Sequence, residues 1–252
     1  MNCGCKLGIQ NANIIVYADD IVLLAPSRRA LQILINEAIE ESSKLELAVN
    51  HLKSKYMVFR SKVSGPASYG PIFINDVLIE RVETFKYLGF ILNEKLNNIE
   101  DICRVRNKFY SNFNSILRKF HFADVRVKIF LFRQFCLQFY GVEMWFQNNK
   151  ALGALKQFGI GYHKAIKKIL GLSYHESNHY SCQEASLYTF EHLMNKIKFN
   201  ATVRLFMTPC SFVAKLREHL YISSVLLREI RDTFLSVYDI EAIFETMPKH
   251  IG

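Results

Sequence analysis

Residues 13–25 read Asn-Ile-Ile-Val-Tyr-Ala-Asp-Asp-Ile-Val-Leu-Leu-Ala, and this stretch decides the fold class of the chain. Two short apolar runs rich in β-forming residues, 14–16 and 21–24, flank a polar tip. The pattern predicts a β-hairpin whose strands are buried on at least one face. Asp19 and Asp20 stand together at its tip. Neighbouring carboxylates are costly unless a cation compensates them, and their hard oxygens suit Mg²⁺. For an isolated Asp pair, an ordinary solvated turn is the favoured alternative.

Beyond the hairpin the chain continues as a mixture of helix and strand. Ser27 is a candidate N-cap, and apolar residues that recur every three or four positions from Arg28 onward predict an amphipathic helix. Further strands are predicted at 56–60, 72–74, 77–80 and 85–92, with a loop at 61–71.

The pattern changes after Asn93 and becomes helical. An apolar stripe between residues 102 and 120 predicts an amphipathic helix whose polar side carries Arg104, Lys108 and Arg118. Residues 125–146 are apolar almost all round, as in the central helix of a bundle. Further helices are predicted at 149–170, 182–207 and 212–246. The predicted fold class is α+β, with a β-rich domain at 1–95 and an α-helical domain at 96–252.

Composition narrows the class of partner. The chain has 32 Lys and Arg against 23 Asp and Glu, a net charge of +9 that favours nucleic acid ahead of an anionic membrane surface. A mildly basic protein without such a partner is the alternative. The six cysteines show no paired CxxC spacing, no secretory signal precedes them, and no apolar run is long enough to span a membrane. We therefore expect an intracellular protein, in the nucleus or cytoplasm, that has no membrane partner.

Four motifs resemble one protein family. Residues 17–20 (YADD) resemble the YxDD box of reverse transcriptases, and the wider string VYADDIVLLAPS at 16–27 is similar to its form in non-LTR (long interspersed element) retrotransposons. Three later stretches follow in the order that this family requires. They are NHLKSKYMVF at 50–59, similar to the segment with the palm lysine, FKYLGF at 85–90, similar to the primer-grip turn, and FYGVEMW at 139–145, similar to the YGxExW stretch. The glycine usual ahead of the palm-lysine segment is absent.

The resemblance implies a role for each matching position. Asp19 would be a direct metal ligand, Asp20 a supporting carboxylate, and Lys53 the group that neutralises or protonates the departing pyrophosphate. Trp145 would be a packing anchor. The implied cofactor is Mg²⁺ in a two-metal site, and the implied partners are an RNA template, a DNA primer and dNTP. The residues implied to contact primer or template are Tyr17, Ala18, Tyr87, Leu88, Gly89, Arg104, Lys108 and Arg118, although a solvated face is an alternative for the last three.

The implied function is RNA-directed DNA polymerase, with a partial palm followed by a helical thumb. The family takes its remaining metal-binding Asp from an earlier strand, and residues 1–16 contain no Asp. We therefore expect a truncated fragment that is inactive alone; a non-catalytic basic nucleic-acid-binding remnant or a pseudogene product is the alternative. His175, His179 and Cys182 have spacings reminiscent of metal ligands, but a polar helix start is favoured because no second cysteine pair completes the set.

Overall fold

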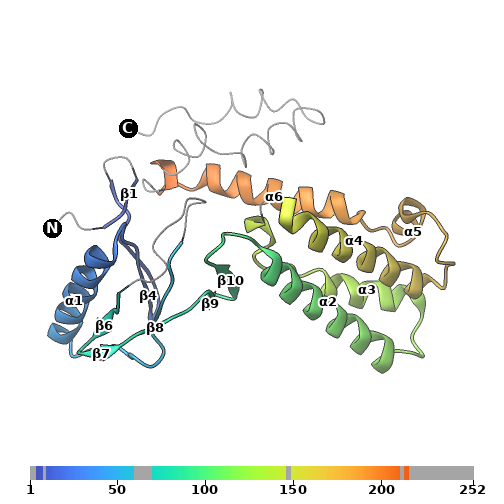
Figure 1. Cartoon of the computed structure of the whole chain (residues 1–252). Helices are drawn as coiled ribbons and strands as arrows, with labels where there is room; N and C mark the ends of the chain where they lie inside the picture. Colours follow the sequence, from blue (N-terminus) through green and yellow to red (C-terminus); the bar gives the residue numbers. More distant parts are fainter. Residues whose placement is uncertain (1–3, 8–9, 60–69, 146–148, 211–212, 216–252) are drawn as a thin grey trace. The chain divides into compact units, whose positions relative to one another are not determined.

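The computed structural model describes residues 4–7, 10–59, 70–145, 149–210 and 213–215 (Figure 1). It confirms the predicted α+β class. Two compact units divide the chain: the first holds the described residues up to Glu83 and from Leu205 onward, and the second holds Thr84–Arg204. Most of the predicted loop at 61–71 and of the predicted helix at 212–246 lies outside the described residues.

The first unit contains the predicted hairpin. Strands β3 (Ile14–Tyr17) and β4 (Asp20–Leu23) are antiparallel, and Tyr17 lies opposite Asp20, so Ala18 and Asp19 form a two-residue loop. Ala18 adopts a left-handed backbone with φ 53°. Tight hairpin loops require such a conformation because it matches the twist of the flanking strands. The hairpin is therefore confirmed at the predicted position.

The predicted burial of this hairpin is wrong. The exposed fractions of Ile14, Ile15 and Val16 are 52%, 45% and 59%. In the part of the chain that the structure describes, β3 and β4 form a sheet of two strands only, so no third strand covers an edge. Only the end of β4 approaches a core, where Leu23 packs against the buried residues of this unit. The apolar pattern of a strand thus indicates a surface that can be buried. Burial also requires another strand or helix that packs on that surface.

Helix α1 (Arg28–Lys44) organises the small core of the first unit. The Ser27 hydroxyl accepts a hydrogen bond from the Ala30 amide at 3.2 Å, which confirms the predicted N-cap. Ile35 on the helix packs with Ile72, Ile74 and Ile79. The short strands of this unit are β1 (Lys6–Leu7), β2 (Gln10–Asn11), β5 (Lys55–Tyr56), β6 (Phe73–Ile74), β7 (Val77–Leu78) and β8 (Glu80–Arg81).

The predicted strands of this unit form only in part. β6 and β7 pair antiparallel through a turn at Asn75 and Asp76, both with left-handed φ. β5 pairs with β8 in parallel and ends at Tyr56, so the predicted strand at 56–60 is wrong for 57–59, which are not in a strand.

The second unit begins with a hairpin and continues as helices. Strands β9 (Thr84–Tyr87) and β10 (Phe90–Asn93) are antiparallel, which divides the predicted strand 85–92 at its centre. The helices are α2 (Ile99–Lys119), α3 (Val125–Cys136), the 3-10 turn η1 (Val142–Met144), α4 (Asn149–Leu170), α5 (Asn178–Glu184) and α6 (Phe190–Met207), the last of which ends beyond this unit. Among the described residues, every helix is too short or too polar to span a bilayer.

An aromatic cluster holds the helices α2, α3 and α4 together. Phe109, which is 1% exposed, lies at its centre on α2. Its ring centroid lies 5.4 to 6.4 Å from six other aromatic rings, those of Tyr110, Phe113, Phe132, Phe139, Phe158 and Tyr162. Edge-to-face and tilted pairs at such distances add to the stabilisation that burial already provides.

Two helix predictions of this unit are wrong. Residues 125–146 do not form one helix buried all round: α3 ends at Cys136, and Phe130 and Phe135 are 60% and 56% exposed. The chain reverses at Gly141, whose φ of 82° no helix accepts. Residues 182–207 are also two helices rather than one, because the chain turns at Ser186, with φ 50°, between α5 and α6.

The division of the chain into compact units places the hairpin 84–93 with the helices. The predicted domains, 1–95 and 96–252, would separate it from them. Those domains were placed where the sequence pattern changes from strands to helices, near residue 95, and they stay a prediction.

Candidate functional site

The tip of the β3–β4 hairpin presents two carboxylates to solvent. Asp19 lies in the loop and Asp20 is the first residue of β4; both are exposed, as is Tyr17 opposite. Ala18, which lies between Tyr17 and Asp19, has the sparsely populated left-handed backbone. Outliers of this kind cluster at functional sites because the surrounding structure must hold them in place. Chemically, the tip is a pair of accessible hard-oxygen donors.

Magnesium fits this donor pair as part of a site. Mg²⁺ is commonly held by one or two protein carboxylates together with the phosphates of a substrate. Within the described ranges no group of three or more His, Cys, Asp and Glu residues is arranged to hold a metal ion. If an ion bound at this tip, Asp19 and Asp20 would supply only part of its ligands, and substrate phosphates would supply others.

Lys53 lies in the same unit, in the turn that follows α1. Its backbone N–H donates to the Asn50 side-chain oxygen at 3.1 Å, and its side chain is exposed. No hydrogen bond or ion pair between described residues joins its ammonium to Asp19 or Asp20. Its predicted role toward pyrophosphate stays a prediction.

The second hairpin, β9–β10, has an equally tight tip. Tyr87 pairs with Phe90, and the two loop residues Leu88 and Gly89 have φ values of 45° and 82°. A Cβ at Gly89 would lie 3.1 Å from the Tyr140 ring, so the aromatic side chain packs directly against the turn. The turn at Gly89 therefore lies inside the predicted strand 85–92, and contact of these residues with a primer stays a prediction.

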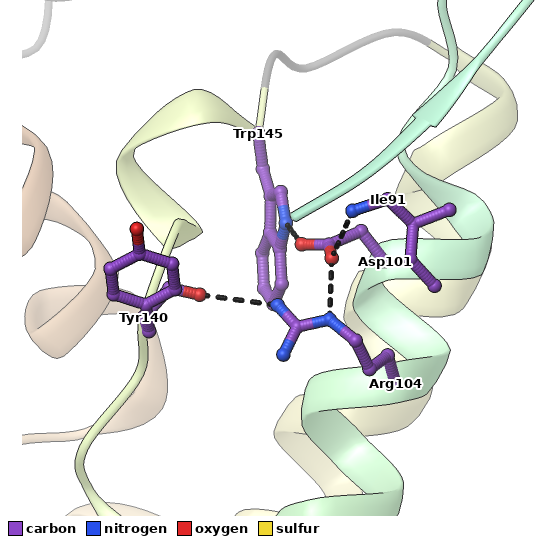
Figure 2. Close-up of polar contacts among 5 residues, drawn as sticks. All are labelled: Ile91, Asp101, Arg104, Tyr140 and Trp145. Carbon is purple, nitrogen blue, oxygen red and sulfur yellow. Dashed lines mark hydrogen bonds and ion pairs between the residues drawn. The ribbon is translucent and has the colours of Figure 1, made fainter. Parts of the chain in front are cut away.

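A buried carboxylate ties this hairpin to the helices (Figure 2). Asp101 in the first turn of α2 is fully buried and accepts three hydrogen bonds. The donors are the Ile91 amide at 3.0 Å, the Arg104 Nε at 2.7 Å and the Trp145 indole Nε1 at 2.8 Å. Three segments far apart in sequence therefore meet at one side chain.

Two further contacts fix the same region. Gly141 has φ 82°, and a Cβ there would lie 2.9 Å from the Phe90 ring, so the chain passes close to β10 at this point. Asn93 at the end of β10 is buried; its amide donates to Glu100 at 3.0 Å and its oxygen accepts from the Lys95 N–H at 2.8 Å. Hairpin and helix are thus joined through a hydrogen-bonded junction.

The basic face predicted on α2 is divided in two. Arg104 donates to Asp101 and, through Nη2, to the Tyr140 carbonyl at 3.3 Å, so its guanidinium is part of the packed network. Lys108 and Arg118 are exposed on the same side of the helix. The structure therefore leaves these two side chains accessible to a nucleic-acid backbone and holds the third beside a buried acid.

Sequence reasoning predicted Trp145 as a packing anchor and missed Asp101. Trp145 is indeed buried, at 2% exposed. An acid in the first turn of a helix is ordinarily explained by the helix dipole, and an arginine three residues later by a surface pair. The only signal in the sequence was that the indole N–H of the chain's single tryptophan needs an acceptor when it is buried. That acceptor lies 44 positions away.

Burial makes the two buried cysteines of the helical core, Cys136 and Cys182, poor nucleophiles. Burial raises the pKa of the Cys136 thiol to about 12 and that of Cys182 to about 11. A thiol with so high a pKa carries little thiolate at neutral pH. His175 and His179 are exposed while Cys182 is buried, and the Ser177 hydroxyl accepts from the His179 and Tyr180 amides. The segment is a capped helix start, as the sequence favoured.

The amino-terminal part of the chain matches a known class of protein. Residues 3–92 match the family described as reverse transcriptase (RNA-dependent DNA polymerase), and this segment contains both hairpin tips and Lys53. A protein of Caenorhabditis elegans, described as uncharacterized and transposon-derived, is 28% identical over 147 residues, which cover 57% of this chain and 52% of that protein. The chain thus spans about half the length of the curated relative it matches. No solved structure matches the chain.

Proposed function

We propose that this chain is the carboxy-terminal palm and thumb part of the reverse transcriptase of a non-LTR retrotransposon. The single observation that carries the proposal is the exposed Asp19-Asp20 pair at a tight hairpin tip, within the segment that matches reverse transcriptases. The match to a transposon-derived protein supports the mobile-element origin. The order of the later motifs supports the non-LTR type.

The proposed roles follow the chemistry of each side chain. Asp19 and Asp20 would hold Mg²⁺, which when bound would activate the primer 3′-hydroxyl and stabilise the leaving pyrophosphate. Lys53 would supply positive charge to that pyrophosphate. Tyr17, Ala18, Tyr87, Leu88 and Gly89 would each contact primer or template. Lys108 and Arg118 would contact the backbone of the RNA–DNA hybrid. Such an enzyme takes dNTP as substrate and works in the nucleus or cytoplasm, where its RNA template is found.

We propose in addition that the chain is a fragment that does not polymerise DNA by itself. The family that it resembles completes its metal site with a further Asp on another strand. The carboxylates at 19 and 20 are not joined by a third ligand among the described residues. A substrate-bound Mg²⁺ would then lack one anchoring oxygen, and two-metal chemistry requires both ions to be fixed.

A primer-extension experiment tests the inactivity. The full chain is given poly-rA, oligo-dT and dTTP with Mg²⁺ or Mn²⁺, and we expect no incorporation. Incorporation by the chain that is lost in Asp19→Ala would contradict the inactivity and would establish the site.

A binding experiment tests the proposed site without requiring turnover. The chain should bind an RNA–DNA hybrid with a recessed primer 3′ end more tightly than a continuous hybrid of the same length. In the presence of Mn²⁺ and dTTP, Asp19→Asn should weaken the preference for the end and leave binding of the continuous hybrid unchanged. Equal affinity of the unaltered chain for both hybrids would contradict the proposed polymerase role.

The exposed Lys108 and Arg118 favour a second candidate, a non-catalytic nucleic-acid-binding protein. In that case charge reversal at both positions should lower the affinity for every hybrid alike and reduce the salt dependence of binding. Asp19→Asn would then leave the affinity for every hybrid unchanged. A chain that binds neither hybrid would indicate a pseudogene product.

A further inference from the structure

Asp101 is the residue on which the surroundings of the β9–β10 tip converge (Figure 2). It is 0% exposed, and its three donors come from β10, from its own helix and from the segment after η1. One carboxylate oxygen accepts from Ile91 and Arg104, and the other accepts from Trp145. All three partners are therefore held at fixed places around one rigid group.

The energetics make this network act as a unit. A buried carboxylate is costly unless it is paired and fully hydrogen-bonded. The Arg104 guanidinium supplies the opposite charge at 2.7 Å, and the N–H groups of Ile91 and Trp145 occupy two further acceptor sites of the carboxylate. Hydrogen bonds to an ionised acceptor are stronger than neutral ones. Removal of Asp101 would leave the indole N–H of Trp145 and the charge of Arg104 without their buried partner.

The network holds the hairpin close to its tip. Ile91, which donates to Asp101, lies one residue beyond Phe90, the residue that pairs with Tyr87 across the turn. The Tyr140 ring packs against Gly89, and the Tyr140 carbonyl accepts from Arg104. Gly89 in the turn and Ile91 just beyond it are thus both connected to the same carboxylate, Ile91 directly and Gly89 through Tyr140 and Arg104.

We propose that Asp101 is a positioning residue that fixes the turn 87–90 relative to the start of α2. This inference rests on the proposed function, in which the turn lies against the primer end. Asp101 touches no substrate itself. Its carboxylate fixes the position of the turn through Ile91, and its own position is fixed by hydrogen bonds from Trp145 and Arg104.

A purely structural role for Asp101 makes a different prediction. Any substitution in the packed core would then act alike, in proportion to the stability lost. Ile116→Ala is a matched control, because Ile116 is 4% exposed on the same helix and is not part of the network. A positioning role predicts that Asp101→Ala and Ile116→Ala differ in their preference for the primer end even when both have lost similar stability.

The experiment uses the full chain and two RNA–DNA hybrids, one with a recessed primer 3′ end and one continuous. We expect Asp101→Ala to lower the ratio of the two affinities by about tenfold or to unity, because a small misplacement of a positioned group has effects of this size or larger. Ile116→Ala should keep the ratio of the unaltered chain. Asp101→Asn, which still accepts from Ile91 or Trp145, should restore part of it. An unchanged ratio in Asp101→Ala, or an equal loss in Ile116→Ala, would overturn the inference.

Hydrogen exchange in the free chain separates this inference from the proposed function. The amides of residues 84–93 should exchange faster in Asp101→Ala than in Ile116→Ala, measured where both are folded. If the unaltered chain shows no preference for the primer end, the proposed function fails, and the exchange result alone decides whether Asp101 fixes the hairpin. Equal exchange in the two variants overturns that coupling.

Discussion

The two hairpins of this molecule share one local design and differ in their surroundings. Both have strands of four residues and a two-residue loop, and both carry a motif residue with left-handed φ, Ala18 in one and Gly89 in the other. The β3–β4 hairpin exposes its apolar side chains. The β9–β10 hairpin is hydrogen-bonded to Asp101 and packed against Tyr140. Local sequence forms a hairpin, and long-range contacts decide whether it is held in one place.

The largest expected effect is the loss of the support under β9–β10. Phe109→Ala removes the ring at the centre of the aromatic cluster, and we expect it to lower the unfolding free energy by about 3–5 kcal/mol. Urea unfolding followed by the fluorescence of Trp145, the single tryptophan, measures this loss in the helical unit. Ile15→Ala on the exposed hairpin is the control, with little change. A loss below 1 kcal/mol for Phe109→Ala would contradict the comparison.

A glycine pair tests the close approach between β10 and the chain before η1. Gly141→Ala places a Cβ 2.9 Å from the Phe90 ring at a φ of 82°, and should destabilise by roughly 1–3 kcal/mol. Gly153→Ala in α4 meets nothing within 4 Å and should stabilise by about 0.5–1 kcal/mol. Thermal unfolding of the two variants should shift in opposite directions. A change of melting temperature with the same sign in both variants would show that the close approach of Gly141 to Phe90 does not restrict the residue at position 141.

The helical unit should also lose stability in acid through His163. Burial first, and then the charge of Lys167, lowers the pKa of this imidazole, whose Nε2 accepts from the Phe190 amide at 3.3 Å. The unfolded chain therefore binds the proton more readily, so the contribution is present above pH about 6.5 and is lost as the pH falls below it. Urea unfolding from pH 8 to pH 5 should show this decline. In His163→Gln the decline should be shallower, and an identical slope would exclude this histidine as its source.

The smallest effect on stability is expected at the exposed hairpin, where the effect on association is larger. Val16→Lys replaces a side chain that is 59% exposed, and should change the unfolding free energy by less than about 0.5 kcal/mol. Two-stranded sheets with apolar, unpaired edges favour pairing between chains. Sedimentation of the unaltered chain should therefore show concentration-dependent association that the lysine reduces. A chain that stays monomeric at all concentrations would show that the exposed strands of this hairpin do not pair between chains.

Local features of the fold were predictable because their causes are local. The turn at Ala18-Asp19 and the cap at Ser27 depend on residues a few positions apart, and both were predicted where they form. The apolar pattern of residues 14–16 predicted burial and was wrong, because burial depends on a layer supplied by other residues. The end of α3 at Cys136 was missed for a related reason: the hydrophobic run continues past the point where the chain must turn to reach Gly141.

For the candidate site, too, the local turns could be predicted from the sequence and the long-range contacts could not. Asp19, Asp20 and Gly89 were identified through the resemblance of their motifs, and the structure shows the tight turns on which they lie; their roles stay a prediction. Arg104 was predicted as a contact for nucleic acid, yet its guanidinium also serves a buried acid. Asp101 also accepts from Trp145, and the spacing of residues in the first turn of a helix does not indicate which distant side chain will cover an acid there.

The junction at Asn93 has a consequence for the stability of the hairpin. Its hydrogen bonds to Lys95 and Glu100 link the end of β10 to the connecting segment and to the first turn of α2. Helix α2 is in turn packed against α3 and α4 through the rings around Phe109. A two-stranded hairpin is only marginally stable by itself, so β9–β10 takes its stability from the helical core to which this junction attaches it.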